Sequence, residues 1–326
     1  DRNAADEHFI TRKALSETLI MAFLKELYYL SMIDAIDKIF SHEKADTFTD
    51  KTLQAIDIKK ILEYAGERKL SAAPLIKIQY YLYYYTVNDI SEKEYIKLKA
   101  EFLSAIKLVT GFEKLHFILR MNQIIVTKLV PKNKEFYGEI FRFIKLLCSF
   151  NIFPLEVKVL GRGVYRDFFT TAVILKEYDW AENFVNEYGR FLPEDQRENE
   201  ILLGKGILSF KKNNFDESLK YLNKLKITEL TEKINVRYYY LMNYIELMAY
   251  ESAYSSLSAI RQFCRDRKEI PDVVAGLVSD SLKYFLEIIN CEEKGVKLEG
   301  IIYNEARGGR RYYHKQYILD KMKKLI

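Results

Sequence analysis

The stretch NEILLGKGILSFKKNNFDESLKYLNKL, Asn199–Leu225, contains two apolar patterns separated by the polar break Lys211–Asn214. Within each half the apolar residues recur at intervals of three and four, so they share one face of a helix. These faces consist of Leu203, Gly206, Ile207 and Phe210 in the first half, and of Phe215, Leu219, Leu222 and Leu225 in the second. Gly206 costs a helix roughly 1 kcal/mol relative to alanine. We therefore expect two antiparallel helices that approach each other closely at Gly206.

The same pattern recurs along the chain at an interval of 35 residues, as expected for a repeat protein. The aromatic residues that open the second helices are Trp180, Phe215 and Tyr250, and they are followed at the same spacing by Phe184, Leu219 and Tyr254. The first helices carry Leu175, Phe210 and Ile245, and the small-residue positions are Asn183, Ser218 and Ala253. The spacing predicts tetratricopeptide-like repeats over about residues 165–267.

Composition supports an all-α protein, because 13 glycines and 5 prolines in 326 residues are too few for the turns of an all-β fold. We predict a right-handed α-solenoid of stacked antiparallel helix pairs, which would have a concave face. No run of 18 apolar residues occurs, so no membrane span is expected. The three cysteines lie far apart at positions 148, 264 and 291. They favour a reducing compartment, and we expect a cytoplasmic protein.

The chain divides into residues 1–150, expected to form N-terminal helical hairpins of the solenoid, and residues 151–326, expected to hold the repeats and C-terminal capping helices. The joint is the connector Asn151–Gly163, which contains most of the local proline and glycine. Helices are expected at about 8–39, 49–64, 74–88, 91–109, 112–129, 134–150 and 271–291. Residues 295–309 are expected to form a loop, and 310–326 a terminal helix that covers the apolar face of 271–291.

A run of residues in the first repeat resembles an uncharacterised tetratricopeptide-like family that is common in Bacteroidota and their relatives. The run is Tyr178–Phe184, YDWAENF, followed by Leu192-Pro193-Glu194 and Arg197-Glu198-Asn199. The resemblance extends over about residues 90–326 and includes Ala259–Lys268 and Tyr317–Met322. It implies a bacterial helical-repeat protein, and it carries no catalytic residue to this chain.

Motifs for catalysis, metal binding and cofactor binding do not appear in the sequence. The four histidines are far apart and none belongs to an HExxH pattern. Gly161 and Gly163 lack the preceding strand and the third glycine of a dinucleotide site. Trp180 could anchor a ligand, but its repeat position favours the core. We therefore expect no enzyme activity and no cofactor.

The segment Tyr303–Ile326 has seven basic and two acidic residues, which accounts for the whole net charge of +5. Guanidinium and aromatic groups mixed in this way suit contact with phosphates and bases. The candidate contact residues are Arg307, Arg310, Arg311, Tyr312, Tyr313 and Lys315. The leading hypothesis is a protein-interaction scaffold that binds a peptide or protein partner in the solenoid groove. The alternative is a nucleic-acid-associated protein that uses this tail.

Overall fold

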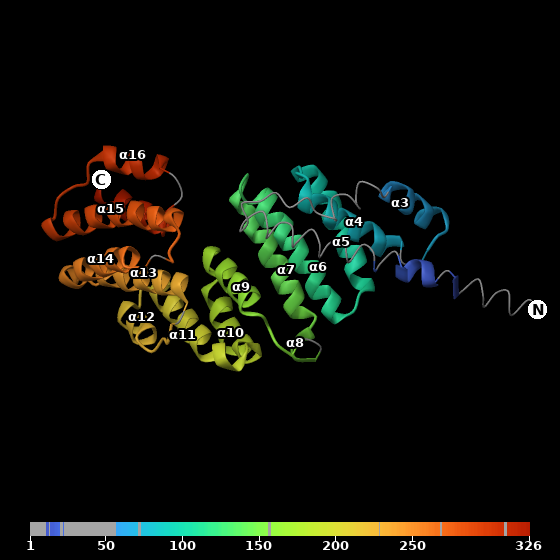
Figure 1. Ribbon diagram of the computed structural model, residues 1–326, viewed down its shortest axis with the longest axis horizontal. Helices are drawn as coiled ribbons and strands as arrows, with labels where there is room; N and C mark the ends of the chain where they lie inside the picture. The colour runs from blue at the N-terminus through green and yellow to red at the C-terminus, as the bar shows by residue number, and fades with distance from the viewer. Residues whose placement is uncertain are drawn as a thin grey trace, which may run out of the picture. The chain divides into compact units, whose positions relative to one another are not determined.

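The computed structural model describes residues 57–70, 73–155, 158–227, 229–267, 269–309 and 312–326, together with 11, 12, 14–19 and 22. All regular structure within these ranges is helical, and neighbouring helices pack in pairs (Figure 1). The fold class is therefore all-α, as predicted. The chain forms two compact units, Asp1–Lys158 and Val159–Ile326. The boundary between them falls inside the connector Asn151–Gly163.

The first unit contains α-helices and, between some of them, short segments of 3-10 or π helix. The α-helices are α3 (Ile58–Glu67), α4 (Ala73–Val87), α5 (Glu92–Ala105), α6 (Gly111–Ile124), α7 (Tyr137–Ser149) and α8 (Ile152–Leu155). The short segments are η1 (Ile106–Leu108), η2 (Ile125–Leu129) and η3 (Lys134–Phe136). The expected helix 8–39 and the start of the helix expected at 49–64 lie almost entirely outside the described residues.

Helix α5 begins where the sequence predicts it, because Ser91 and Glu94 form a reciprocal cap. The Glu94 backbone N–H donates to Ser91 Oγ at 3.3 Å, and the Ser91 N–H donates to Glu94 Oε2 at 2.8 Å. The two bonds satisfy N–H groups that a helix start leaves unpaired. Within the unit, Phe102 of α5 meets Phe143 of α7 edge to face, with ring centroids 5.2 Å apart.

The second unit is a succession of helices in which each packs on the next. They are α9 (Arg162–Ile174), α10 (Tyr178–Tyr188), η4 (Gly189–Phe191), α11 (Glu194–Lys211), α12 (Phe215–Leu222), α13 (Leu230–Glu246), α14 (Tyr250–Arg265), α15 (Asp272–Lys294), α16 (Gly300–Gly308) and α17 (Lys315–Leu325). Helix α9 also packs on α11, and α11 on α13. The first helices of three successive hairpins therefore lie side by side.

The prediction of a loop at 295–309 is wrong, because most of this segment forms helix α16. The glycines that suggested a loop stand at the ends of this helix, at Gly300 and Gly308, where they do not interrupt it. Ala306 is fully buried, and α16 packs on α17. The terminal helix is correspondingly shorter than expected and begins at Lys315 instead of Arg310.

Three hairpins close with the same turn. The residues Lys176, Asn213 and Met248 have left-handed backbones, with φ of 62°, 62° and 55°. Each is followed by a residue whose N–H donates five positions back: Glu177 to Ala172 at 2.9 Å, Asn214 to Ser209 at 2.8 Å and Ala249 to Tyr244 at 2.9 Å. This bond and the left-handed residue together satisfy carbonyl groups at a helix end.

These turns correct the register of the first repeat. The interval of 35 residues holds from Asn213 to Met248, but Lys176 precedes Asn213 by two residues more. Tyr178, Phe215 and Tyr250 therefore open the three second helices, and Ala181, Ser218 and Ala253 are the fully buried small residues. The expected small position Asn183 is exposed. The first repeat is longer because α10 and α11 are longer than α12 and α13.

Trp180 consequently lies two residues inside α10, and does not open it. Its ring stacks on Phe184 at 5.1 Å with an angle of 13° between the planes. Trp180 is half-buried, whereas Phe184 is almost completely buried.

Gly206 stands where two helices approach closely, as the sequence analysis expected. A Cβ at this position would lie 3.0 Å from Cδ2 and 3.2 Å from Cγ of Leu222 in α12. The sequence analysis missed a second close approach at Gly204. A Cβ there would lie 2.9 Å from Cγ2 of Val185 in α10. Helix α11 thus uses one glycine against its own hairpin partner and another against the preceding hairpin.

Candidate functional site

Helices α9, α11 and α13 lie side by side, and we call the side of this layer that carries the contacts described below the inner face. On α13 it is marked by Glu232, Tyr239 and Glu246, because residues seven apart lie on nearly the same side of a helix. On α11 it is marked by Glu200 and Ile207 for the same reason. The side-chain contacts described below connect these residues to each other and to the C-terminal segment, Tyr312–Leu325.

The C-terminal segment lies on the inner face. The ring of Tyr317 contacts Phe210 of α11, with centroids 5.8 Å apart, and Phe285 of α15, with centroids 5.9 Å apart. Its hydroxyl donates to Glu246 Oε1 of α13 at 2.8 Å. The contact with α15 is the one that the sequence predicted for the terminal helix. The contacts with α11 and α13 place the segment across three neighbouring helices.

Lys321 fixes this position with two carboxylates. Its Nζ lies 3.3 Å from Glu246 Oε2 and 2.7 Å from Glu292 Oε1. Only 11% of the Lys321 side chain is exposed. The segment completes the burial of α13, where Val236, Tyr238, Tyr239, Leu241, Met242, Asn243 and Ile245 are all buried. A helix buried on all sides needs neighbours on all sides, and α17 supplies one of them.

His314 lies at the start of the segment in a left-handed backbone conformation, with φ of 53°. Its ring contacts Tyr238 and Tyr239, with centroids 5.1 and 5.5 Å away. Burial, with the positive charge of Lys211 as a second cause, lowers the pKa of His314 to about 3. The imidazole is therefore neutral at physiological pH. Among the described residues its buried Nε2 has no hydrogen-bond partner.

The candidate contact residues of the tail differ in how exposed they are. Arg307 is exposed at the end of α16, whereas Arg310 and Arg311 lie outside the described residues. Tyr312 is buried, and its hydroxyl donates to the carbonyl of Ala306 at 3.1 Å. Tyr313 stacks on Tyr238 at 5.3 Å. Tyr312 thus packs inside the unit, and the half-buried Tyr313 has one face against Tyr238.

Lys315 is held near the same turn. Its Nζ donates to the carbonyl of Gly309 at 2.7 Å and lies 5.2 Å from the centroid of the Tyr312 ring. The structure thus brings Tyr312 and Lys315 together, with both engaged by the unit itself.

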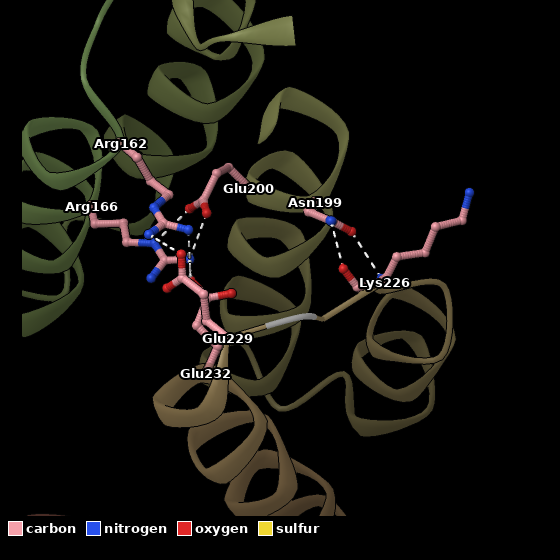
Figure 2. A network of polar contacts seen from close by, with 7 residues as sticks. All are labelled: Arg162, Arg166, Asn199, Glu200, Lys226, Glu229 and Glu232. Atoms are coloured by element: carbon pink, nitrogen blue, oxygen red, sulfur yellow. Dashed lines mark hydrogen bonds and ion pairs between the residues drawn. The ribbon is translucent and has the colours of Figure 1, made fainter. Parts of the chain in front are cut away.

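The opposite end of the inner face carries an ion-pair network of Arg162, Arg166, Glu200, Glu229 and Glu232, which we call the Arg166 network (Figure 2). Arg166 donates from Nε to Glu200 Oε2 at 2.7 Å and from Nη2 to Glu200 Oε1 at 2.5 Å, and it also pairs with Glu232. Only 4% of the Glu200 side chain is exposed. Burial alone would lower the pKa of Arg166, but the hydrogen bonds and charge of Glu200 and the charge of Glu232 raise it.

Arg162 extends the network to the start of α13. Its Nη2 lies 2.5 Å from Glu229 Oε1, and its Nη1 lies 3.2 Å from Glu232 Oε1. A single layer of charges therefore connects α9, α11 and α13. Beside it, the Asn199 amide bonds both the carbonyl and the N–H of Lys226, each at 2.9 Å (Figure 2).

The Arg166 network was not predicted from the sequence, although two signals point to it. Glu200 continues the apolar face of α11 one turn before Leu203, so a carboxylate stands in a row that is otherwise apolar. Arg162 and Arg166 are four residues apart on one helix face. A buried carboxylate needs a paired cation, and arginines at helical spacing can supply it.

Between the network and the C-terminal segment, the inner face has an open strip. The hairpin turns align Thr170 of α9 with Ile207 of α11, and Ile174 with Lys211. Thr170 is exposed, and 47% of Ile174 is exposed. Leu203 and Ile207 are half-buried. The apolar side chains of the strip are Ile174, Leu203 and Ile207, and the strip is bordered by the Arg166 network at one end and by α17 at the other.

Within the part of the chain that the structure describes, no group of three or more His, Cys, Asp or Glu residues could hold a metal ion. Nor does a helix among these residues have the length and apolar character needed to cross a membrane. The chain matches no family model, no curated protein and no solved structure.

Proposed function

We propose that the second unit is a right-handed, tetratricopeptide-like α-solenoid and that the protein is a scaffold that binds a protein or peptide partner. The observation that carries this proposal is the C-terminal segment, because the inner face already holds a helix of the chain itself. Aromatic contacts and a bridging lysine attach that helix, and a partner helix could be held by the same kinds of contact. Recognition of a helix in a groove uses such apolar anchors with charges at the rim.

The repeated hairpins support the solenoid. Three closing turns have the same conformation, and the first helices stack directly on one another. Arrays of this kind expose an extended face that is formed by equivalent helices. A scaffold of this kind needs no catalytic group, because its function is to bind a partner.

The open strip is the proposed partner site. Ile174 and Ile207 offer apolar contact, and the Arg166 network provides a polar border. A partner would lie next to α17, in the part of the inner face that the described helices of the second unit leave exposed. We expect an extended or helical segment with apolar side chains at its centre.

A site-specific photocrosslinking experiment in the native cell tests the proposal. A photoreactive phenylalanine would replace Thr170 or Ile174 of α9, both of which are exposed. The matched control places it at Asn183, an exposed residue on the second helix of the same hairpin. We expect a discrete protein adduct from positions 170 and 174 that is absent from position 183.

Equal adducts from all three positions would contradict partner binding at the strip, as would adducts with nucleic acid alone. Mass spectrometry of the adduct would identify the partner segment.

A further inference from the structure

Two arginines of the second unit share one phenyl ring, away from the Arg166 network. The guanidinium carbon of Arg237, on α13, lies 4.1 Å from the centroid of Phe263 on α14. The guanidinium carbon of Arg267, just after α14, lies 5.5 Å from the same centroid. We call these three residues the Phe263 cluster. Cation–π contact orients both guanidinium groups on the ring.

Arg237 is further held by its own helix. Its Nη1 donates to the carbonyl of Lys233 at 3.1 Å, which fixes the direction of the side chain. Arg237 is half-buried, and Arg267 is exposed. Burial, and then the positive charge of Arg267, lower the pKa of Arg237. The cluster is therefore preorganised and is open to solvent on the Arg267 side.

Neither arginine has a carboxylate within 4 Å in the described part of the chain, in contrast to Arg162, Arg166 and Lys321. The Cys264 thiol is the acidic group that acts electrostatically on Arg237. Burial raises its pKa, so the thiol stays neutral at physiological pH. The Phe263 cluster therefore contains two positive charges that no carboxylate of the described residues pairs with.

An uncompensated, partly desolvated guanidinium is unfavourable, and arginine cannot relieve it by losing its proton. A phosphate monoester carries about −1.5 to −2 charges at pH 7, which matches two guanidinium groups. Its oxygens accept parallel N–H bonds from guanidinium donors. A single carboxylate would supply only half of the required charge.

We propose that Arg237 and Arg267, held on Phe263, form a binding site for a phosphoryl group. The group would come either from a free phosphate compound or from a phosphorylated residue of a polypeptide. The site lies on α13 and α14, so it is separate from the open strip, and it stands whether or not the strip binds a partner.

The site can be tested by titration of the purified full chain, with the arginine side-chain N–H signals observed by NMR. The probes are inorganic phosphate, a short peptide with one phosphoserine, the same peptide with serine, and acetate at matched ionic strength. We expect saturable shifts of the Arg237 and Arg267 signals with both phosphorylated probes and much weaker ones with acetate. Tighter binding of the phosphopeptide assigns the site to a phosphorylated polypeptide, and tighter binding of phosphate assigns it to a free anion.

Variants distinguish a built site from general charge attraction. Arg237→Gln and Arg267→Gln should each weaken phosphate binding at least about tenfold, which corresponds to 1.4 kcal/mol. The matched control is Arg261→Gln, an exposed arginine of α14 that should leave binding unchanged. Arg237→Lys keeps the charge but loses the planar fork. It should bind more weakly than the wild type and more tightly than Arg237→Gln.

The proposal is overturned if no saturable shift occurs, or if the Arg261 variant weakens binding as much as the other two. Melting curves of each variant would confirm that the chain is folded during the titration.

Discussion

Helix α13 carries two charged regions. In the first the charges are paired with opposite charges, and in the second they are not paired within the described residues. Glu232 at the start of α13 accepts from Arg162 and pairs with Arg166, Glu200 accepts from Arg166, and Glu229 accepts from Arg162. One turn further on, Arg237 shares a ring with Arg267 and has no carboxylate in reach among the described residues. Charges that join helices of the same unit are paired with each other, so the network is expected to have a structural role. The Phe263 cluster lacks such a pair and is therefore available to a ligand.

His314 shows a third outcome for a buried base. It has no carboxylate partner among the described residues either, but its pKa falls to about 3 and it becomes neutral. Arginine cannot respond in this way, because its guanidinium group keeps its proton in proteins even where burial lowers its pKa. Without a carboxylate partner among the described residues, His314 therefore loses its proton, whereas Arg237 keeps its charge.

The largest effect is expected when the paired region is broken. Arg166→Met would leave Glu200 buried without its two hydrogen bonds, and removal of one partner from a buried pair costs about 3–5 kcal/mol. We expect about 3 kcal/mol, since the Arg166 side chain is itself partly exposed. Urea unfolding, followed by hydrogen exchange of α9, α11 and α13, would measure the loss.

Lys220→Met is the matched control, because Lys220 pairs with Glu217 on the exposed surface of α12. Exposed pairs are worth about 0–1 kcal/mol, so this variant should be close to the wild type. Similar losses in the two variants would show that the Arg166 network is not more important than an ordinary surface pair.

Much of the helical arrangement could be predicted from the sequence, because apolar spacing determines helix faces. Leu203, Gly206 and Phe210 were assigned to one face, and Gly206 does contact α12 closely. The predicted register of the first repeat was wrong, because an aromatic residue was taken as the start of each second helix. The true markers are the left-handed residues Lys176 and Asn213, which have no shared side-chain chemistry.

The candidate sites were harder to predict, because they depend on contacts between distant segments. The sequence identified the basic tail, but composition alone could not show that Tyr312 and Tyr313 pack inward. Arg237 and Arg267 are 30 residues apart and belong to no motif. Only the packing of α14 on α13 brings both to Phe263.

The second largest effect is expected in the pH dependence of the unfolding free energy, and it depends on His314. Its pKa is about 3 in the folded chain and about 6.5 in the unfolded chain, so only the unfolded state gains the proton between these values. The stabilising contribution is complete above about pH 6.5 and falls by about 1.4 kcal/mol per unit as the pH decreases toward 3. Acidification from pH 7 to pH 5 should therefore cost about 2 kcal/mol through this residue.

His314→Asn should remove this part of the pH dependence, because asparagine tolerates the left-handed backbone and does not titrate. Unfolding free energies of both proteins at pH 7 and pH 5 give the difference. Carboxylates elsewhere contribute equally to the two proteins and cancel. Parallel pH profiles would indicate that His314 is accessible to protons in the folded state.

The smallest effect is expected at the unpaired region, and its sign is the sharpest test of the comparison. Arg237→Gln removes a half-buried charge that no carboxylate of the described residues compensates, so stability without added anions should change by less than about 0.5 kcal/mol or increase slightly. Arg237 gains a cation–π contact of about 0.5–1 kcal/mol and one hydrogen bond to the carbonyl of Lys233, and burial opposes these gains. Urea unfolding in a chloride buffer at pH 7, beside Arg166→Met, would measure both variants under the same conditions. A loss close to that of Arg166→Met would mean that Arg237 has a compensating partner within the folded chain. The cluster would then be a structural contact like the Arg166 network, and the ligand that its free charge implies would no longer be needed.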